Sequence, residues 1–296
     1  MSTSVSESKY QPGQWGFSSD HLPVSAEVKL NDNDSFSVAS FNVLNEAYKE
    51  YLLYGNSSPG SAEYKRGQQL GGSELVTMSP ETRWKENLKI IKKGLVNGLG
   101  IIGLQECSQK FMSLLLEEIG CRNEDNYDLL HASEDLKRGE DYGVIIFDKT
   151  QFQFIASSVL YYYNEDNSRS NYIHSVLFSH IITRTKFTFI NTHIPFKKSD
   201  QFVSYILKCS GPVIAVGDFN LGYNDVRSES NLKRNLIDRL ENSGYRFVEN
   251  LAEFSHVNTE PVLDLFDHII FKEMTLVAYP RMTGILRENF SLANRK

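Results

Sequence analysis

The chain has 296 residues, 41% of them hydrophobic and 23% charged, a composition typical of a globular protein rather than a disordered or fibrous one. The net charge of −6 argues against a large basic surface for duplex DNA, but it leaves a nucleotide substrate open. No apolar run reaches about eighteen residues, and the N-terminal segment has no apolar core, so we expect neither a membrane span nor a secretion signal.

The cysteines are Cys107, Cys121 and Cys209, and no two of them have CxxC spacing. Such a sparse, odd set indicates neither a disulfide framework nor a zinc site, and it favours a reducing compartment. We therefore expect a cytoplasmic protein, with the nucleus as the alternative. No linker or internal repeat divides the chain, so we predict a single catalytic domain over residues 1–296 and no evident protein partner.

The first predicted elements are two β-rich segments, residues 22–30 and 36–44, which flank a polar turn at 31–34 and indicate a β-hairpin. Residues 45–80 show little periodicity and are expected to form a long loop. The later helices are expected at residues 79–95, 108–119, 199–209 and 229–242. The later strands are expected at residues 101–105, 142–148, 153–163, 172–183, 186–192, 212–217, 266–272 and 275–280. This pattern favours two sheets packed face to face with helices outside.

Acidic, amide and imidazole groups recur where these strands begin or end, a place where scaffolds often present reactive groups. They are Asn42, Glu106, His193, Asp218, Asn220 and Asp267. A single residue of this kind is most often a turn or helix-cap residue, or a structural histidine. Six of them in one chain point to a shared site.

The segments that carry these residues are FNVLN, LQE, DYGVIIF, INTH, GDFN and DHIIF, in that order between residues 36 and 272. This series resembles the endonuclease/exonuclease/phosphatase superfamily of metal-dependent phosphoesterases. The resemblance implies an α/β (α+β) fold, a four-layered αββα sandwich with two mixed β-sheets.

The resemblance departs from the family pattern at its end. A family member normally closes with an SDH-x-P-V strand, and the stretch after DHIIF contains nothing like it. Instead, SSDHLPVSAEV stands at residues 18–28, so the sequence looks circularly permuted, with the usual last strand at the N-terminus. The alternative is that SDHLPV is a coincidental turn followed by an edge strand.

By resemblance, the cofactor is Mg²⁺, with Mn²⁺ as the alternative. Mg²⁺ binds oxygen ligands and keeps several waters, so one or two carboxylates suffice to hold it. The resemblance makes Glu106 the principal metal ligand and places Asp20 and Asn42 close to it.

The remaining roles also follow from the resemblance. Asp218 would orient or deprotonate the attacking water, and Asn220 and His193 would bind the phosphate. His21 would donate to a phosphoryl oxygen, while Asp267 would accept from the other ring nitrogen of His21. Lys197 is expected at the substrate entrance, although a solvated helix start is the commoner explanation for a lysine there.

Among the family's branches, FNVLNEAYKEYL and WKENLKII are most similar to the deadenylase and 2′,5′-phosphodiesterase group. This implies an Mg²⁺-dependent phosphodiester hydrolase, a nuclease that acts on RNA or a short single-stranded oligonucleotide. Two alternatives stay open. One is a phosphomonoesterase or a hydrolase of phospholipid or inositol-phosphate headgroups, and the other is a catalytically silent binding protein of the same fold.

Overall fold

The computed structural model describes Ser19, His21 and residues 23–31, 34–46, 78–120, 126–132, 141–163, 169–195, 198–220, 231–248, 256–257, 263–264 and 266–278. Most of the loop expected at 45–80 lies outside these residues, as do Asp20 and Lys197. No helix in the described part of the chain has the length and apolar character needed to span a bilayer.

Two six-stranded sheets form the centre of the molecule. The first has the order β14-β1-β2-β3-β5-β4, from β1 (Val24–Asn31), β2 (Asp34–Asn42), β3 (Leu99–Cys107), β4 (Tyr127–Ala132), β5 (Tyr142–Asp148) and β14 (Thr275–Ala278). The second has the order β10-β13-β9-β8-β7-β6, from β6 (Phe152–Tyr163), β7 (Arg169–His180), β8 (Lys186–His193), β9 (Val213–Asp218), β10 (Tyr245–Phe247) and β13 (Asp267–Lys272). A separate two-stranded ribbon joins β11 (His256–Val257) to β12 (Leu263–Asp264).

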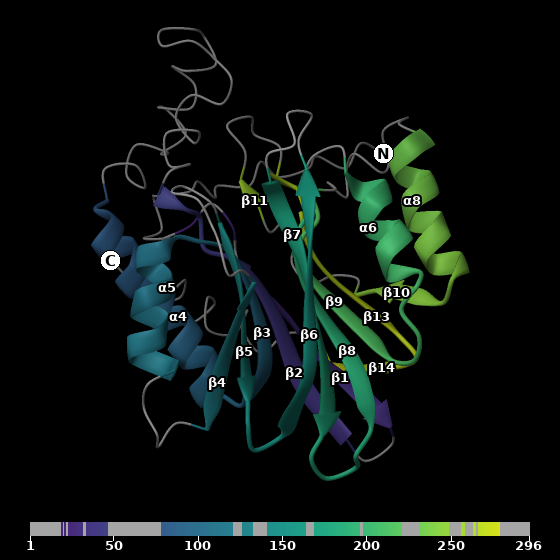
Figure 1. Cartoon of the computed structure of the whole chain (residues 1–296), viewed down its shortest axis with the longest axis horizontal. Helices are drawn as coiled ribbons and strands as arrows, with labels where there is room; N and C mark the ends of the chain where they lie inside the picture. Colours follow the sequence, from purple (N-terminus) through teal and green to yellow (C-terminus); the bar gives the residue numbers. More distant parts are fainter. Residues whose placement is uncertain are drawn as a thin grey trace, which may run out of the picture.

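Helices cover the outer faces of both sheets (Figure 1). One outer layer contains α4 (Pro80–Val96), α5 (Gln109–Leu115) and a π-helical turn (Leu116–Gly120), and the other contains α6 (Ser199–Ile206) and α8 (Asn231–Asn242). One apolar cluster fills the space between the sheets. A second cluster packs one helical layer against its sheet, and a third does the same for the other layer. The predicted αββα sandwich is confirmed. Both sheets are mixed, since β2 pairs with β3 and β8 with β9 in parallel, and the other pairings are antiparallel.

The predicted N-terminal hairpin is present. Strands β1 and β2 pair antiparallel from Val24↔Ser40 to Asn31↔Asp34, and the Asn31 side chain donates a 2.9 Å hydrogen bond to Asp34 across the turn. Strand β14, the last described strand, pairs with β1 on its other side. The first and last described strands of the chain are therefore neighbours in one sheet.

Helix α4 begins as the sequence predicts. The Ser79 hydroxyl accepts a 3.2 Å hydrogen bond from the Thr82 amide, and Pro80 occupies the first turn, where its missing N–H costs nothing. Trp84, Leu88 and Ile91 are buried on one face against the first sheet. Burial of this stripe fixes the helix on the sheet that carries Asn42 and Glu106.

Several elements differ from the sequence prediction, among them the two-residue strands β11 and β12, which were not predicted. Strands β4 and β10 were not predicted, because the first alternates only weakly in polarity and the second has three residues. Strand β7 ends at His180 rather than 183, because the chain turns at 181–183 and Arg184 takes a left-handed backbone conformation with φ 60°. The turn leads directly into β8, which carries His193 at its end.

Candidate active site

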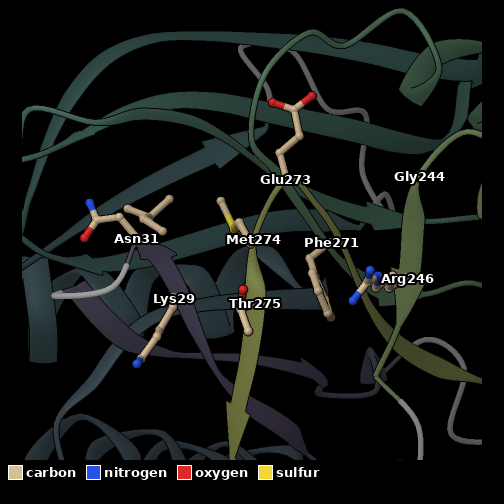
Figure 2. Close-up of a pocket in the computed structure, with 9 residues that line it drawn as sticks. Lys29, Asn31, Gly244, Arg246, Phe271, Glu273, Met274 and Thr275 are labelled. Carbon is tan, nitrogen blue, oxygen red and sulfur yellow. The ribbon is translucent and has the colours of Figure 1, made fainter.

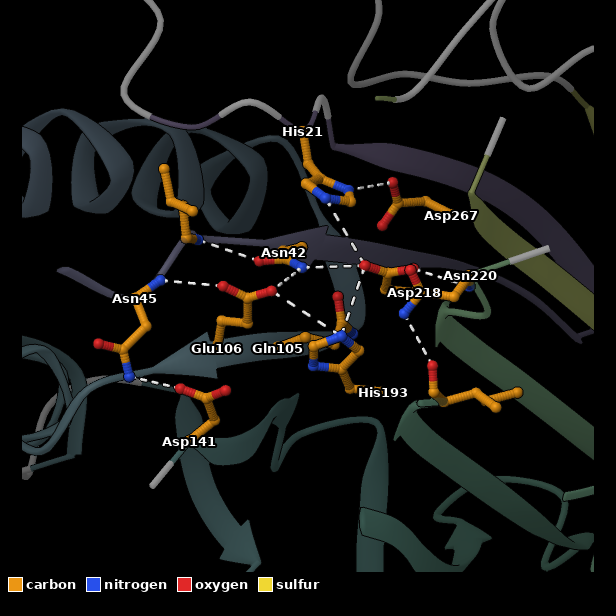
Figure 3. A network of polar contacts seen from close by, with 12 residues as sticks. His21, Asn42, Asn45, Gln105, Glu106, Asp141, His193, Asp218, Asn220 and Asp267 are labelled. Atoms are coloured by element: carbon orange, nitrogen blue, oxygen red, sulfur yellow. Dashed lines mark hydrogen bonds and ion pairs between the residues drawn. The ribbon is translucent and has the colours of Figure 1, made fainter. Parts of the chain in front are cut away.

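The predicted site residues that the structure describes meet at one edge of the sandwich, where β2 and β3 end in one sheet and β8 and β9 end in the other (Figure 3). Glu106, His193 and Asp218 each offer a ligand atom, and these atoms all lie within 4.8 Å of one another. All three residues are buried, with at most 8% of their surface exposed. Residues separated by more than one hundred positions are thus brought together by the packing of the two sheets.

Glu106 lies in β3 with a left-handed backbone, φ 57°. This conformation is unusual for a residue with a side chain and occurs most often at functional sites. One carboxylate oxygen accepts a 2.8 Å hydrogen bond from the Asn42 side-chain amide, and the other accepts a 3.1 Å bond from the Asn45 backbone N–H. Both oxygens of the carboxylate are therefore held in place.

Asp218 ends β9 and faces Glu106 from the other sheet. One of its oxygens accepts a 2.9 Å bond from the Asn220 backbone N–H, and the other accepts a 3.1 Å bond from Asn42. The preceding residue must be glycine, because a Cβ on Gly217, at φ 151°, would lie 1.9 Å from the Thr192 carbonyl oxygen. That close approach of β8 and β9 places Asp218 beside His193.

Asn42 connects the two carboxylates. Its side-chain NH₂ donates to Glu106 and Asp218, while its Oδ1 accepts a 3.0 Å bond from the Leu44 backbone N–H. The backbone donor fixes which end of the amide faces the site. Asn42 thus holds two negative groups at close range.

Two histidines face the carboxylates. His193 Nε2 lies 3.8 Å from a Glu106 oxygen and 3.7 Å from an Asp218 oxygen, and its buried Nδ1 has no hydrogen-bond partner among the described residues. His21 Nε2 lies 3.6 Å from Asp218, and its Nδ1 is 2.7 Å from Asp267. Asp267 is fully buried, so it fixes the orientation of the His21 ring.

The contact between His21 and Asp267 confirms a specific expectation. The two residues are 246 positions apart. A hydrogen bond between them was expected on the interpretation that the SDHLPV segment supplies part of the site. Ser19 of the same segment donates a 2.8 Å bond to the Asn42 backbone carbonyl. The segment is therefore bonded to both sheets at the site.

The donor set fits a divalent cation. Two buried carboxylates and an imidazole offer ligand atoms that lie within 4.8 Å of one another, and in the described part of the chain the ion-pair partner of Glu106 is a histidine rather than a lysine or arginine. Carboxylate oxygens are preferred by Mg²⁺, and Mn²⁺ also accepts imidazole nitrogen. Glu106 and Asp218 are thus placed to hold such an ion.

Two groups behind the site remain neutral. Burial raises the pKa of the Cys107 thiol well above its ordinary value, and the charges of Asp141 and Glu106 raise it further. Burial likewise raises the pKa of the Tyr172 phenol, with Cys107 and nearby carboxylates adding to the effect. Neither group is therefore available as an anionic nucleophile at neutral pH.

No family model and no curated protein sequence matches this chain. Solved structures do match it. An endonuclease/exonuclease/phosphatase from Bacteroides vulgatus superimposes with a TM-score of 0.53 at 14% identity, over 85% of this chain and 87% of that one. The chain has the endonuclease/exonuclease/phosphatase fold. ANGEL2, a 2′,3′-cyclic phosphatase, gives a TM-score of 0.52 at 13% identity, over 88% of both chains. A mannosyl-6-phosphatase from Bacteroides thetaiotaomicron gives 0.50 at 15% identity, over 79% of this chain and 84% of that one.

Three further polar residues, His268, Asn220 and Tyr162, lie in or next to the strands of the second sheet. His268 packs between the rings of Phe219 and Phe247 at 5.4 and 5.7 Å. Asn220 donates from its side chain to the Ile194 carbonyl at 2.7 Å, at the edge of the site. Tyr162 is fully buried in the apolar cluster under α6, which supports a packing role.

One polar contact was missed by the sequence prediction. The side chain of Asn45 donates a hydrogen bond to Asp141, which is buried, and its backbone N–H binds Glu106 (Figure 3). Asp141 precedes the YGVIIF strand, and Asn45 follows Asn42 by three residues. The motif pattern contained both residues, but they meet because β2, which precedes Asn45, and β5, which follows Asp141, lie on either side of β3.

A separate cavity of about 400 Å³ lies at the opposite end of the strands (Figure 2). Its lining includes Lys29, Arg246 and Glu273 and none of the residues of the site. Asn31, another lining residue, ends β1 beside the start of β2, whereas Asn42 is the last residue of β2. With one carboxylate and no histidine in its lining, this cavity lacks the donor set found at the site.

Proposed function

We propose that this protein is a Mg²⁺-dependent phosphoester hydrolase. The observation that carries the proposal is the convergence of Glu106, Asp218 and His193, joined by the His21–Asp267 pair, at one edge of the sandwich. Phosphoester hydrolysis requires neutralisation of phosphate charge, an oriented water and a stabilised leaving oxygen. The carboxylates, the histidines and the Asn220 amide supply groups for the first two requirements, and solvent supplies the proton that the leaving oxygen takes up.

Glu106 and Asp218 would hold the cation, which supplies positive charge to the phosphate when bound. Asp218 also takes a proton from the attacking water, and the oxygen of that water forms the new bond to phosphorus. The bond from phosphorus to the leaving oxygen then breaks, and that oxygen takes up a proton from solvent. His21 Nε2 donates to a phosphoryl oxygen, and its Nδ1 stays bonded to Asp267. Asn220 and His193 bind the remaining phosphoryl oxygens.

The substrate that we propose is a phosphodiester in RNA or a short single-stranded oligonucleotide. The net charge of −6 supports a small or single-stranded substrate over long duplex DNA. The likeness to a 2′,3′-cyclic phosphatase supports a nucleotide substrate, while the likeness to a sugar phosphatase supports the phosphomonoesterase alternative. A catalytically silent binding protein is disfavoured, because every described position to which the resemblance assigns a catalytic role carries a side chain able to perform it.

We further propose that the chain is a circular permutation of the usual strand order. Strand β1 lies between β14 and β2, and His21 just before it contacts Asp267 at the start of β13. Strand β1 thus lies beside β14, the last described strand, although β1 comes first in the sequence. The SDHLPV motif at residues 19–24 supports the same order.

Glu106→Gln is expected to weaken binding of Mg²⁺ without unfolding the protein. The amide has nearly the same shape but lacks the negative charge on which a hard cation depends. Titration calorimetry with Mg²⁺ measures the effect, and Glu117→Gln on the exposed π-helical turn is the matched control. Wild-type Mg²⁺ affinity in the Glu106 variant would exclude Glu106 as the principal ligand.

A single-stranded oligonucleotide or short RNA is expected to be hydrolysed faster than duplex DNA of the same sequence. The reason is that the protein has a net charge of −6 and duplex DNA carries two phosphate backbones, so duplex DNA is repelled more strongly than a single strand. Initial rates at fixed ionic strength measure this preference, and a sugar phosphate and an inositol phosphate are assayed beside them. Faster hydrolysis of either monoester would favour the phosphomonoesterase, and equal cutting of duplex DNA would remove the single-strand assignment.

A further inference from the structure

A buried amide, Asn191, crosses from the second sheet to the first. It lies on β8 two residues before His193, so the two side chains share the face that looks toward the other sheet. Its Nδ2 donates to the backbone carbonyls of Leu104 at 2.9 Å and Val144 at 3.1 Å, and its Oδ1 accepts a 2.7 Å bond from Gln105. Both hydrogens and the oxygen of the amide are used, and none of its surface is exposed.

These partners lie at the irregularity of β3 that presents Glu106. Leu104 pairs with Val144 on β5, but the next pair is Cys107 with Tyr142, so β3 holds one extra residue over this interval. A bulge of this kind interrupts the ladder and re-aims a side chain. Glu106 lies inside the bulge with its left-handed backbone. Asn191 therefore donates to the last regular pair before the bulge.

The surroundings leave room for this bridge. A Cβ on Gly103 would lie 2.8 Å from Asn191 Oδ1 and 2.6 Å from a methyl carbon of Val216, so a larger residue there would displace the amide. On its other side, Gln105 accepts a 3.3 Å bond from the Ser40 hydroxyl on β2, the strand that ends at Asn42. The bridge thus reaches from β8 through β3 to β2.

We propose that Asn191 is a positioning residue that sets the distance of Glu106 from His193 and Asp218, and thereby the affinity for the divalent cation. This inference rests on the proposed function, since the cation site is that of the hydrolase. The core between the sheets is otherwise mainly apolar, and apolar contacts are non-directional. A fully satisfied buried amide is directional and fixes one register between the layers.

The test compares Asn191→Leu with Thr192→Val in the full-length protein. Thr192 is the adjacent residue in β8 and is equally buried, but its side chain points to the opposite face of the strand from Asn191 and donates a 2.8 Å bond to the Tyr172 carbonyl on β7. Binding of Mn²⁺ is followed by electron paramagnetic resonance of the free ion, a readout that needs no substrate. We expect Asn191→Leu to raise the Kd for Mn²⁺ by about 10- to 100-fold, the usual cost of losing a group that orients a metal ligand. Thr192→Val should bind Mn²⁺ as the wild type does.

Gln105→Met removes the same bridge from the other side and should give a loss of similar size. A folded Asn191→Leu or Gln105→Met protein with wild-type Mn²⁺ affinity would overturn the inference. So would failure of both variants to fold when Thr192→Val folds, because the bridge would then serve the fold and not the site. If the wild type itself binds no Mn²⁺, the proposed function fails first, a result distinct from any difference between variants.

Discussion

Asp218→Asn is expected to reduce turnover of a phosphodiester by roughly two or more orders of magnitude, the usual scale for a positioned acid–base or electrostatic group. The amide cannot take a proton from water, and it carries no charge toward a cation. The fold should persist, because an amide oxygen can still accept from the Asn220 N–H. Steady-state kinetics with thermal unfolding as a parallel readout measures both effects.

His21→Asn is expected to cause a loss of the same order. The asparagine side chain keeps a donor near the position of Nδ1, so Asp267 retains a partner, but the Nε2 donor is lost. His21→Ala is a less clean variant, because it takes the 2.7 Å partner away from a fully buried carboxylate and would also lower stability. Asp200→Asn and His131→Ala, both at exposed residues, are the matched controls. Near-normal rates in either site variant would remove its assigned role.

Moving the N-terminal segment to the C-terminus is expected to preserve activity, whereas deleting it should abolish activity. The new chain begins at residue 33, directly before β2, and residues 1–32 follow Lys296. If the chain is circularly permuted, as we propose, this gives the usual strand order of the family, and it keeps β1 between β14 and β2. Deletion of residues 1–25 removes His21, Ser19 and the start of β1, so we expect loss of turnover and of cooperative unfolding.

Trimming a polar N-terminus is normally harmless, which makes the deletion informative. A control protein that lacks only residues 1–12 should keep the site residues and full activity. If the protein without residues 1–25 folds and turns over at the wild-type rate, then SDHLPV is a coincidence and other residues complete the site. If the reordered chain folds but is inactive, the N-terminal segment does not act as a relocated last strand.

Much of the scaffold follows from local patterns. Ser79 and Pro80 mark the start of α4, and the apolar spacing of Trp84, Leu88 and Ile91 gives its buried face. The hairpin around Asn31 and Asp34 follows from a polar turn between two β-rich segments. These features depend on neighbours within a few residues, so a sequence reveals them directly.

The contacts that complete the site depend on the packing of the sheets. Asn191 and Gln105 are 86 residues apart, and Asn45 and Asp141 are 96 apart. No periodicity encodes such pairs, because each forms only after the strands take their registers. The His21–Asp267 pair was predicted only because the family resemblance assigned a role to each of the two residues. The resemblance thus pointed to the carboxylates and histidines, while the bulge at Glu106 and the amide bridge needed the structure.

The central claim is tested most directly by turnover of an activated phosphodiester as a function of Mg²⁺ concentration. The protein is first treated with excess chelator and then titrated back with Mg²⁺, and the Asp218→Asn protein, prepared in parallel, reports any contaminating hydrolase. We predict no turnover in chelator, recovery on addition of Mg²⁺, and little recovery in the variant. Full turnover in chelator, or equal rates for wild type and Asp218→Asn, would contradict a metal-dependent hydrolase at this site.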